Sequence, residues 1–282
     1  MINFLKEWEE AEKIMLKTEL KKIIGSPQYL ICVAILFVLL MIGTTGFWAD
    51  TLMTGETVSM LVHFWNAWDF FGRVYIVVPL LVTVPITFLL HDELNSGYLY
   101  FSLHRAGKGR YVMIKMIAGI LSGILMIFLA ELLFTVLLII LTPGEINFTD
   151  QQNVLDENST NFYLNLIRDG NGWIVYGIWS LLACLYGGVF SAIAVATSVL
   201  ARNKYVATIV PFIVFLLAEN LMFRFGFLPL VLRASFENIF YPAFRRYWMC
   251  GIPISLTCAL IWIIGSLILF WYVICRKIKG KI

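Results

Sequence analysis

The sequence predicts an all-α membrane protein with six transmembrane helices, a preceding amphipathic helix at the membrane interface and both termini in the cytoplasm. Hydrophobic residues make up 60% of the chain, charged residues only 14%, and the mean hydropathy is +0.85. This balance excludes an ordinary soluble domain. Six apolar runs each approach or exceed the length of about 20 residues that a helix needs to cross a bilayer core. The runs cover residues 29–46, 74–90, 112–141, 173–200, 205–223 and 251–274.

The chain reads as one transmembrane domain over residues 1–282, and an interfacial helix at residues 1–25 opens it. In that segment apolar side chains recur at helical spacing, and Glu and Lys fill the opposite side. Ser26 and Pro27 then supply an N-cap and a first-turn proline for the first span. No small-residue cleavage site follows this span, so we expect it to act as its own insertion signal.

Basic residues set the predicted orientation, because cytoplasmic loops of membrane proteins are enriched in Lys and Arg. Most of the 21 Lys and Arg residues precede the first span or lie in residues 91–111, in the turn after the fourth span or in the C-terminal tail. We therefore expect cytoplasmic termini, extracellular segments at 142–172 and 224–250, and a bacterial plasma membrane. Segment 224–250 departs from the rule, because four arginines interrupt its apolar residues.

Tryptophans cluster in the first outer loop, where the sequence holds Trp48, Trp65 and Trp68. Trp173 begins the fourth span on the same predicted side. Trp rings favour the membrane–water interface, so these residues predict an outer aromatic belt that anchors the protein.

Residues for hydrolysis or metal binding are missing from the predicted spans. His63, His91 and His104 all lie in predicted loops, so no span histidine can activate Ser191. No side chains have metal-ligand spacing, and the sequence around Lys108 lacks two residues of a phosphate-binding loop. We therefore expect a protein that is no enzyme, with no catalytic residue, metal or cofactor of its own. The net charge of +3 reflects topology rather than nucleic-acid binding. The five scattered cysteines, mostly within spans, argue against a disulfide framework.

Two acidic residues, Glu131 and Glu219, interrupt the third and fifth spans. An ionisable group at membrane depth indicates a functional site by default, and a structural salt bridge is the alternative. Arg73 and Arg224 are candidate partners that would keep a carboxyl group charged, whereas burial without a partner would keep it neutral. The sequence leaves open whether these acids serve translocation or structure.

Small residues recur at four-residue spacing in two spans. Gly119 and Gly123 form such a row in the third span, and Gly188, Ala192 and Ala196 form another in the fourth. These rows allow helices to approach closely, either within one chain or between two chains.

The segment from His91 to Lys115 carries the most specific pattern. It combines Glu93 with Gly97, Tyr98, Leu99, Leu103, Arg110 and Lys115. This spacing resembles the loop before the third span in permease subunits of type-2, ABCG-like ABC exporters, and the layout of the whole chain is similar to theirs. The pattern departs at Tyr98, where Thr is frequent, and at Ala106, where Pro is frequent.

This resemblance implies an exporter permease that carries no ATPase of its own. It implies a separate ATP-binding cassette subunit, which binds ATP and Mg²⁺ and docks on the 91–111 loop, and a second permease, identical or homologous. An amphipathic peptide or a hydrophobic compound is the expected substrate, and the bilayer is the expected surroundings. Two alternatives are a membrane scaffold or sensor that transports nothing, and an ion-coupled carrier that uses Glu131 and Glu219.

Overall fold

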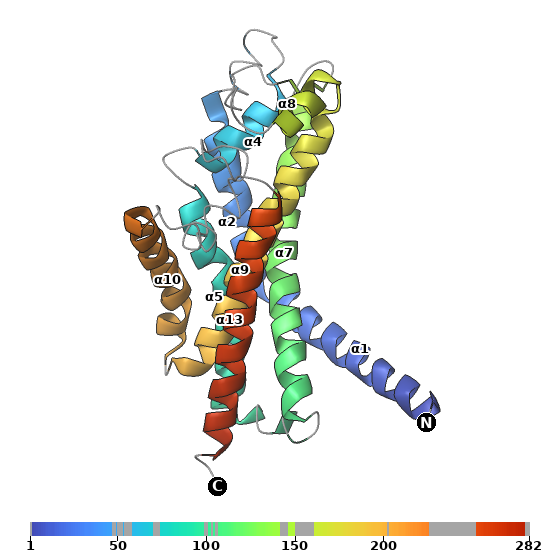
Figure 1. The fold of residues 1–282 in the computed structure, drawn as a ribbon, viewed down its shortest axis with the longest axis vertical. Coiled ribbons are helices and arrows are strands. Elements are labelled where there is room, and N and C mark those ends of the chain that lie inside the picture. Colours follow the sequence, from blue (N-terminus) through green and yellow to red (C-terminus); the bar gives the residue numbers. More distant parts are fainter. Residues whose placement is uncertain are drawn as a thin grey trace.

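The structure, a computed structural model, describes residues 2–46, 49, 53, 58–69, 74–98, 101, 102, 104, 107–141, 146–149, 161–201, 203–225 and 252–279. Within these residues the regular secondary structure is helical throughout, and long helices run side by side in a bundle (Figure 1). The helices are α1 (Ile2–Ile24), α2 (Pro27–Gly43), α4 (Met60–Asp69), α5 (Val74–Asn95), α7 (Lys108–Leu141), α8 (Asn161–Arg168), α9 (Gly172–Leu200), α10 (Lys204–Phe225) and α13 (Ile252–Lys279).

Each of the six predicted spans coincides with one helix, namely α2, α5, α7, α9, α10 or α13. Four of them, α5, α7, α9 and α13, contain segments long and apolar enough to cross a membrane. The end of α1 and α2 together form a fifth candidate, a pair bent by 61°. The apolar part of α10 that passes the same search, Lys204–Ala218, is shorter. The chain is therefore an all-helical protein with four to five candidate membrane-spanning helices in the described part.

The bend between α1 and α2 follows from the residues that join them. The backbone N–H of Tyr29 donates to the Ser26 hydroxyl oxygen at 3.3 Å, which caps α2 as predicted, and Pro27 occupies the first turn. Helix α1 consequently leaves the bundle at a wide angle (Figure 1), and its place at the membrane interface stays a prediction.

Helix α9 lies at the centre of the bundle. It packs against α7, α13, α5 and α10, and nearly all its side chains from Leu182 to Val199 are buried. Its small residues bring α7 especially close: a Cβ atom added to Gly123 of α7 would lie 2.5 Å from the carbonyl oxygen of Gly187. A Cβ added to Gly119 would lie 2.6 Å from a methyl group of Val195. The small residues Gly119 and Gly123 therefore face Gly187, Ser191 and Val195 of α9 within one chain, whereas Gly188 packs against Ile120 and Ile124 of α7.

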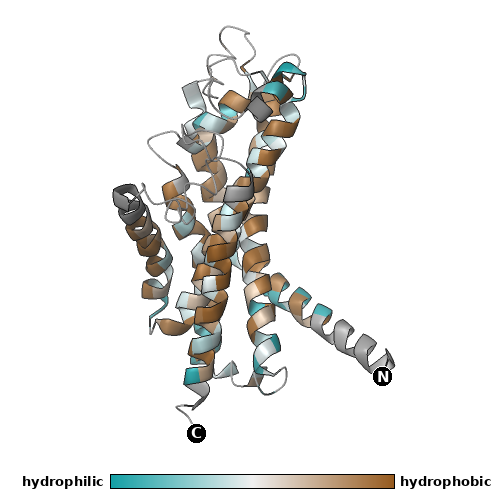
Figure 2. Cartoon of the chain, in the orientation of Figure 1, coloured by the Kyte–Doolittle hydropathy of each residue, from teal (hydrophilic) through white to brown (hydrophobic). Residues whose placement is uncertain are grey.

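The helices of the bundle are hydrophobic along most of their length (Figure 2). Large hydrophobic side chains point away from the core on α2, α7, α10 and α13, including Ile31, Phe128, Ile213 and Ile264. A soluble protein rarely exposes so much contiguous apolar surface, whereas lipid tails cover it without cost.

Helix α4, which the sequence did not predict, inserts into the upper end of the bundle, the end that also holds α8 in Figure 1. It packs against α2, α5 and α9, and its residues from Met60 to Phe64 are all buried. Trp68 is also buried, with 1% of its surface exposed, so its predicted place in an interfacial belt is wrong. Trp173 is 61% exposed, and its place in such a belt stays a prediction.

Candidate functional site

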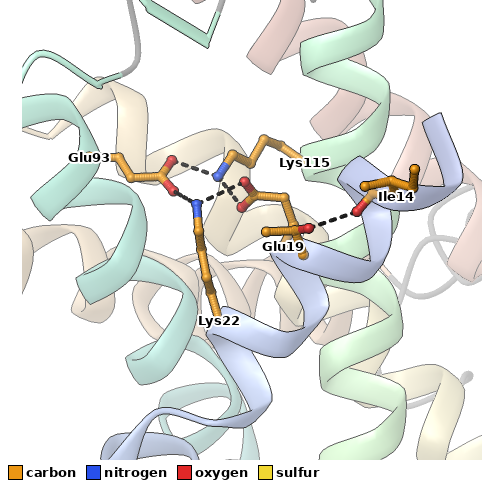
Figure 3. A network of polar contacts seen from close by, with 6 residues as sticks. Ile14, Glu19, Lys22, Glu93 and Lys115 are labelled. Atoms are coloured by element: carbon orange, nitrogen blue, oxygen red, sulfur yellow. Dashed lines mark hydrogen bonds and ion pairs between the residues drawn. The ribbon is translucent and has the colours of Figure 1, made fainter. Parts of the chain in front are cut away.

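Four charged side chains, three of them buried and Lys22 half-buried, form an ionic network near the lower end of the bundle, the end at which α5 stops and α7 begins (Figures 1 and 3). The ammonium group of Lys115 on α7 binds the carboxylates of Glu19 on α1 and Glu93 on α5. The distance from Lys115 Nζ to Glu93 Oε2 is 2.6 Å. Lys22 on α1 reaches the same two acids, at 3.3 Å from Glu19 Oε1 and 3.7 Å from Glu93 Oε1. The network ties three helices together.

Local sequence explains how each member reaches the network. Glu19 and Lys22 lie three residues apart on one face of α1, the spacing at which helical side chains meet. Helix α5 continues past the predicted end of its span to Asn95, which brings Glu93 onto a helix. Helix α7 begins at Lys108, so Lys115 lies two turns inside it.

Charge balance makes this burial tolerable. Glu19 and Lys115 are each 4% exposed, and Glu93 is 8% exposed. Removing one partner from such a group leaves an uncompensated buried charge, which costs about 3–5 kcal/mol. The two acids and two bases therefore act as one unit that holds α1, α5 and α7 in a fixed arrangement.

Gly97 ends α5 and turns the chain toward α7. Its φ of +73° lies in the left-handed region that favours glycine, as is common just after a helix. The next residue, Tyr98, is 44% exposed, and its ring lies 4.8 Å from Lys22 Nζ. Phe101 is 63% exposed, and its ring centroid lies 6.3 Å from that of Tyr98. An exposed aromatic pair thus lies next to the ionic network.

The remaining residues of the 91–111 motif are placed less fully. Arg110 lies in the first turn of α7 and is half-buried. Leu99 and Leu103 lie outside the described residues. The structure therefore pairs Glu93 with Lys115 directly and connects Tyr98 to Glu93 through Lys22. The docking role of the loop stays a prediction.

Glu131 lies about 24 Å farther along α7 than Lys115, at about 1.5 Å per residue. It is buried, and the Ser180 hydroxyl on α9 donates a hydrogen bond to its Oε2 atom. The Trp68 side chain on α4 lies beside the same carboxyl group, whose Oε1 atom is buried and has no hydrogen-bond partner among the described residues. The partners that the structure gives Glu131 are thus neutral groups rather than the arginines considered from the sequence. Arg73 and the side chains of Glu219 and Arg224 lie outside the described residues.

A second polar contact holds α10 against α5 inside the bundle. The hydroxyl groups of Thr87 and Thr208 lie 2.6 Å apart, and Thr83 donates to the Thr208 carbonyl oxygen at 3.2 Å. Such hydrogen bonds between helices are typical of membrane interiors, where no water competes for them.

Sequence reasoning missed Glu19 and Lys22. Their signal was an i, i+3 pair of opposite charges near the end of an amphipathic helix, but that pair also fits a solvated helix face. Only the fold shows that the pair turns inward and meets Glu93 and Lys115.

Among the described residues, no group of three His, Cys, Asp or Glu side chains is placed to hold a metal ion. The sequence matches no protein-family model, and a comparison with curated proteins gives no match.

Proposed function

We propose that this chain is the membrane-spanning permease subunit of an ATP-driven exporter of the type-2 ABC class. Its six spans are α2, α5, α7, α9, α10 and α13, and α1 lies on the cytoplasmic membrane surface. The lower end of the bundle and both termini face the cytoplasm of a bacterial cell. A separate ATP-binding cassette subunit binds ATP and Mg²⁺, and a second permease, identical or homologous, completes the transporter.

The observation that carries this proposal is the link between the ionic network and the exposed aromatic pair. Tyr98 follows the end of α5 and contacts Lys22, which pairs with Glu93 and Glu19, and Lys115 joins both acids. A partner that binds Tyr98 and Phe101 therefore acts on α1, α5 and α7 together. Such a connection is what a subunit needs when ATP-driven closure occurs on another chain.

The substrate path in this proposal runs between the two permeases, along α2, α5 and α10. Helix α10 packs against α5 and α9. It leaves Val206, Ile209 and Ile213 exposed. This apolar surface fits a second permease together with an amphipathic peptide or another hydrophobic compound.

Co-purification and ATPase activity test the proposal. The chain is co-expressed with the ATP-binding cassette subunit encoded nearest to it, and the pair is reconstituted in proteoliposomes. We expect vanadate-sensitive ATP hydrolysis by the pair. Replacing Tyr98→Asp and Phe101→Asp together should reduce co-purification at least roughly tenfold, the factor that corresponds to losing about 1.4 kcal/mol of binding.

Trp173→Asp provides the matched control, since Trp173 is an aromatic residue of similar exposure at the other end of the bundle. It should leave co-purification unchanged. Equal recovery of the ATP-binding subunit with the double Asp variant and with wild type would contradict the docking role.

A carrier driven by an ion gradient is the second candidate, because Glu131 is an acid buried within the bundle. Transport by proteoliposomes with ATP present and the proton gradient collapsed separates the two. Continued transport supports the exporter, and its loss supports the carrier. A scaffold or sensor predicts no transport under either condition.

A further inference from the structure

The Glu131 region joins the inserted helix α4 to the rest of the upper end. Trp68 near the end of α4 meets the carboxyl group of Glu131 on α7, and Ser180 on α9 bonds to the same group. The carboxyl group is thus shared by three helices. Rings from α4 and α9 pack beside it: the centroid of Phe64 lies 5.3 Å from that of Tyr176 and 5.8 Å from that of Trp179.

Neighbouring hydroxyl groups are already used elsewhere. Thr135 donates to the main-chain carbonyl oxygen of Glu131 at 2.8 Å, and the Tyr176 hydroxyl lies 2.6 Å from the Thr135 hydroxyl. Because the Thr135 proton is committed to that carbonyl, Tyr176 donates its own proton to Thr135. The carboxyl group therefore keeps Ser180 as its donor, and the Trp68 side chain lies beside it. Its Oε1 atom has no hydrogen-bond partner among the described residues.

Two other buried acids of this chain, Glu19 and Glu93, can be compared with Glu131. Glu19 and Glu93 are equally buried acids, and each of them faces two lysine ammonium groups. In the described residues no Lys, Arg or His forms an ion pair with Glu131. Among the described residues, Tyr176 and Cys184 on α9 also lie within electrostatic reach of Glu131, and neither carries a positive charge. On α4, His63 is buried and neutral near pH 7.

We propose that Glu131 holds a proton in this conformation, and that the neutral carboxyl group fixes α4 in the upper end of the bundle through Ser180 and Trp68. An ionised carboxylate without a cationic partner is strongly disfavoured in an apolar interior, and a protonated acid costs far less there. A protonated carboxyl group still accepts hydrogen bonds through its carbonyl oxygen. Glu131 thus keeps its proton as part of the structure and does not bind and release it in a transport cycle. This role is the same whether or not the chain transports a substrate.

Infrared spectroscopy of the purified chain in lipid nanodiscs tests the protonation state. A protonated carboxylic acid absorbs in a region separate from that of a carboxylate. We expect wild type at neutral pH to show this absorption and Glu131→Gln to lose it. Glu93→Gln is the matched control, because an ion-paired acid does not contribute, so its spectrum should keep the absorption. Coincident wild-type and Glu131→Gln spectra in this region would overturn the proposal.

Hydrogen exchange of the backbone amides of residues 60–69, measured at one pH by mass spectrometry, tests the role in seating α4. Glu131→Gln keeps a neutral hydrogen-bonding group and should exchange like wild type. Glu131→Ala should exchange roughly tenfold faster, the factor expected for losing about one hydrogen bond. Faster exchange of equal size in both variants would show that the charged acid holds α4, against the proposal. Should Glu131→Ala not fold, Ser180→Ala takes its place in the comparison.

Discussion

Lys115 on α7 and Glu93 on α5 form a buried ion pair, with 2.6 Å between the ammonium nitrogen and a carboxylate oxygen. This pair joins the helices before and after the segment that carries Gly97, Tyr98 and Phe101. Lys115 also forms an ion pair with Glu19 on α1. The exposed rings of Tyr98 and Phe101 are thereby linked to three helices of the bundle, because breaking a buried ion pair costs about 3–5 kcal/mol.

Charge balance within the network is the first prediction. Lys115→Met leaves two acids against one base and should destabilise the protein by about 3–5 kcal/mol, the usual cost of a broken buried pair. Lys115→Met combined with Glu19→Met restores neutrality and should cost clearly less than the sum of the single changes. Thermal unfolding of the detergent-solubilised protein measures both. Additive losses would show that the side chains act independently.

Close contact between α7 and α9 gives the second prediction. In Gly123→Ala the new methyl group meets the carbonyl oxygen of Gly187 at 2.5 Å, so the helices must move apart. We expect a loss of about 1–3 kcal/mol, as for other overpacked sites. Gly265→Ala in α13 is the control, because open space surrounds its Cβ position and Ala favours a helix. The same unfolding temperature for both variants would contradict the packing argument.

Backbone conformation at Gly97 gives the third prediction. A Cβ atom there meets no neighbour, so Gly97→Ala acts only through the φ of +73°. We expect a cost of about 1–2 kcal/mol, the ordinary penalty for a left-handed residue with a side chain. Gly97→Asn should cost less, since Asn tolerates this region. If Ala and Asn destabilise the protein equally in thermal unfolding, the turn does not depend on this conformation.

Topology in the membrane is the fourth prediction. In a cysteine-free background we expect Trp173→Cys to react with a membrane-impermeant maleimide in intact cells. Phe101→Cys should react only after permeabilisation, because we place the lower end in the cytoplasm. Both positions are more than half exposed, so access to the reagent decides the outcome. The reverse labelling pattern would invert the proposed orientation.

Acid sensitivity at His63 is the fifth prediction. Burial lowers the pKa of His63 to about 4, against an ordinary value of 6.5. The unfolded chain therefore binds this proton at a higher pH than the folded chain. The contribution of a neutral His63 is complete above about pH 6.5 and falls as the pH drops toward 4, by about 3 kcal/mol at most.

Thermal unfolding of wild type and His63→Gln between pH 4 and pH 7 measures this effect. The variant should lose stability less steeply over that window, whatever its stability at pH 7. Parallel curves for the two proteins would assign the acid sensitivity to groups other than His63.

The sequence by itself determined where the long helices lie. In lipid, backbone groups find no water, so an apolar run of sufficient length forms a helix whatever its neighbours are. For this reason the run at 112–141 predicted α7, and Ser26 with Pro27 predicted the start of α2. These signals are local, and the helices α2, α5, α7, α9, α10 and α13 all follow them.

Only the tertiary structure decided which helices meet and what the buried polar groups do. Glu19 and Lys115 are 96 residues apart, and no local pattern pairs them. Trp68 is a residue type that favours membrane interfaces, yet α4 inserts into the bundle and buries Trp68 beside Glu131. Hydropathy records how apolar a segment is and not which surface covers it, so the inserted helix and the neutral partners of Glu131 depend on packing across the chain.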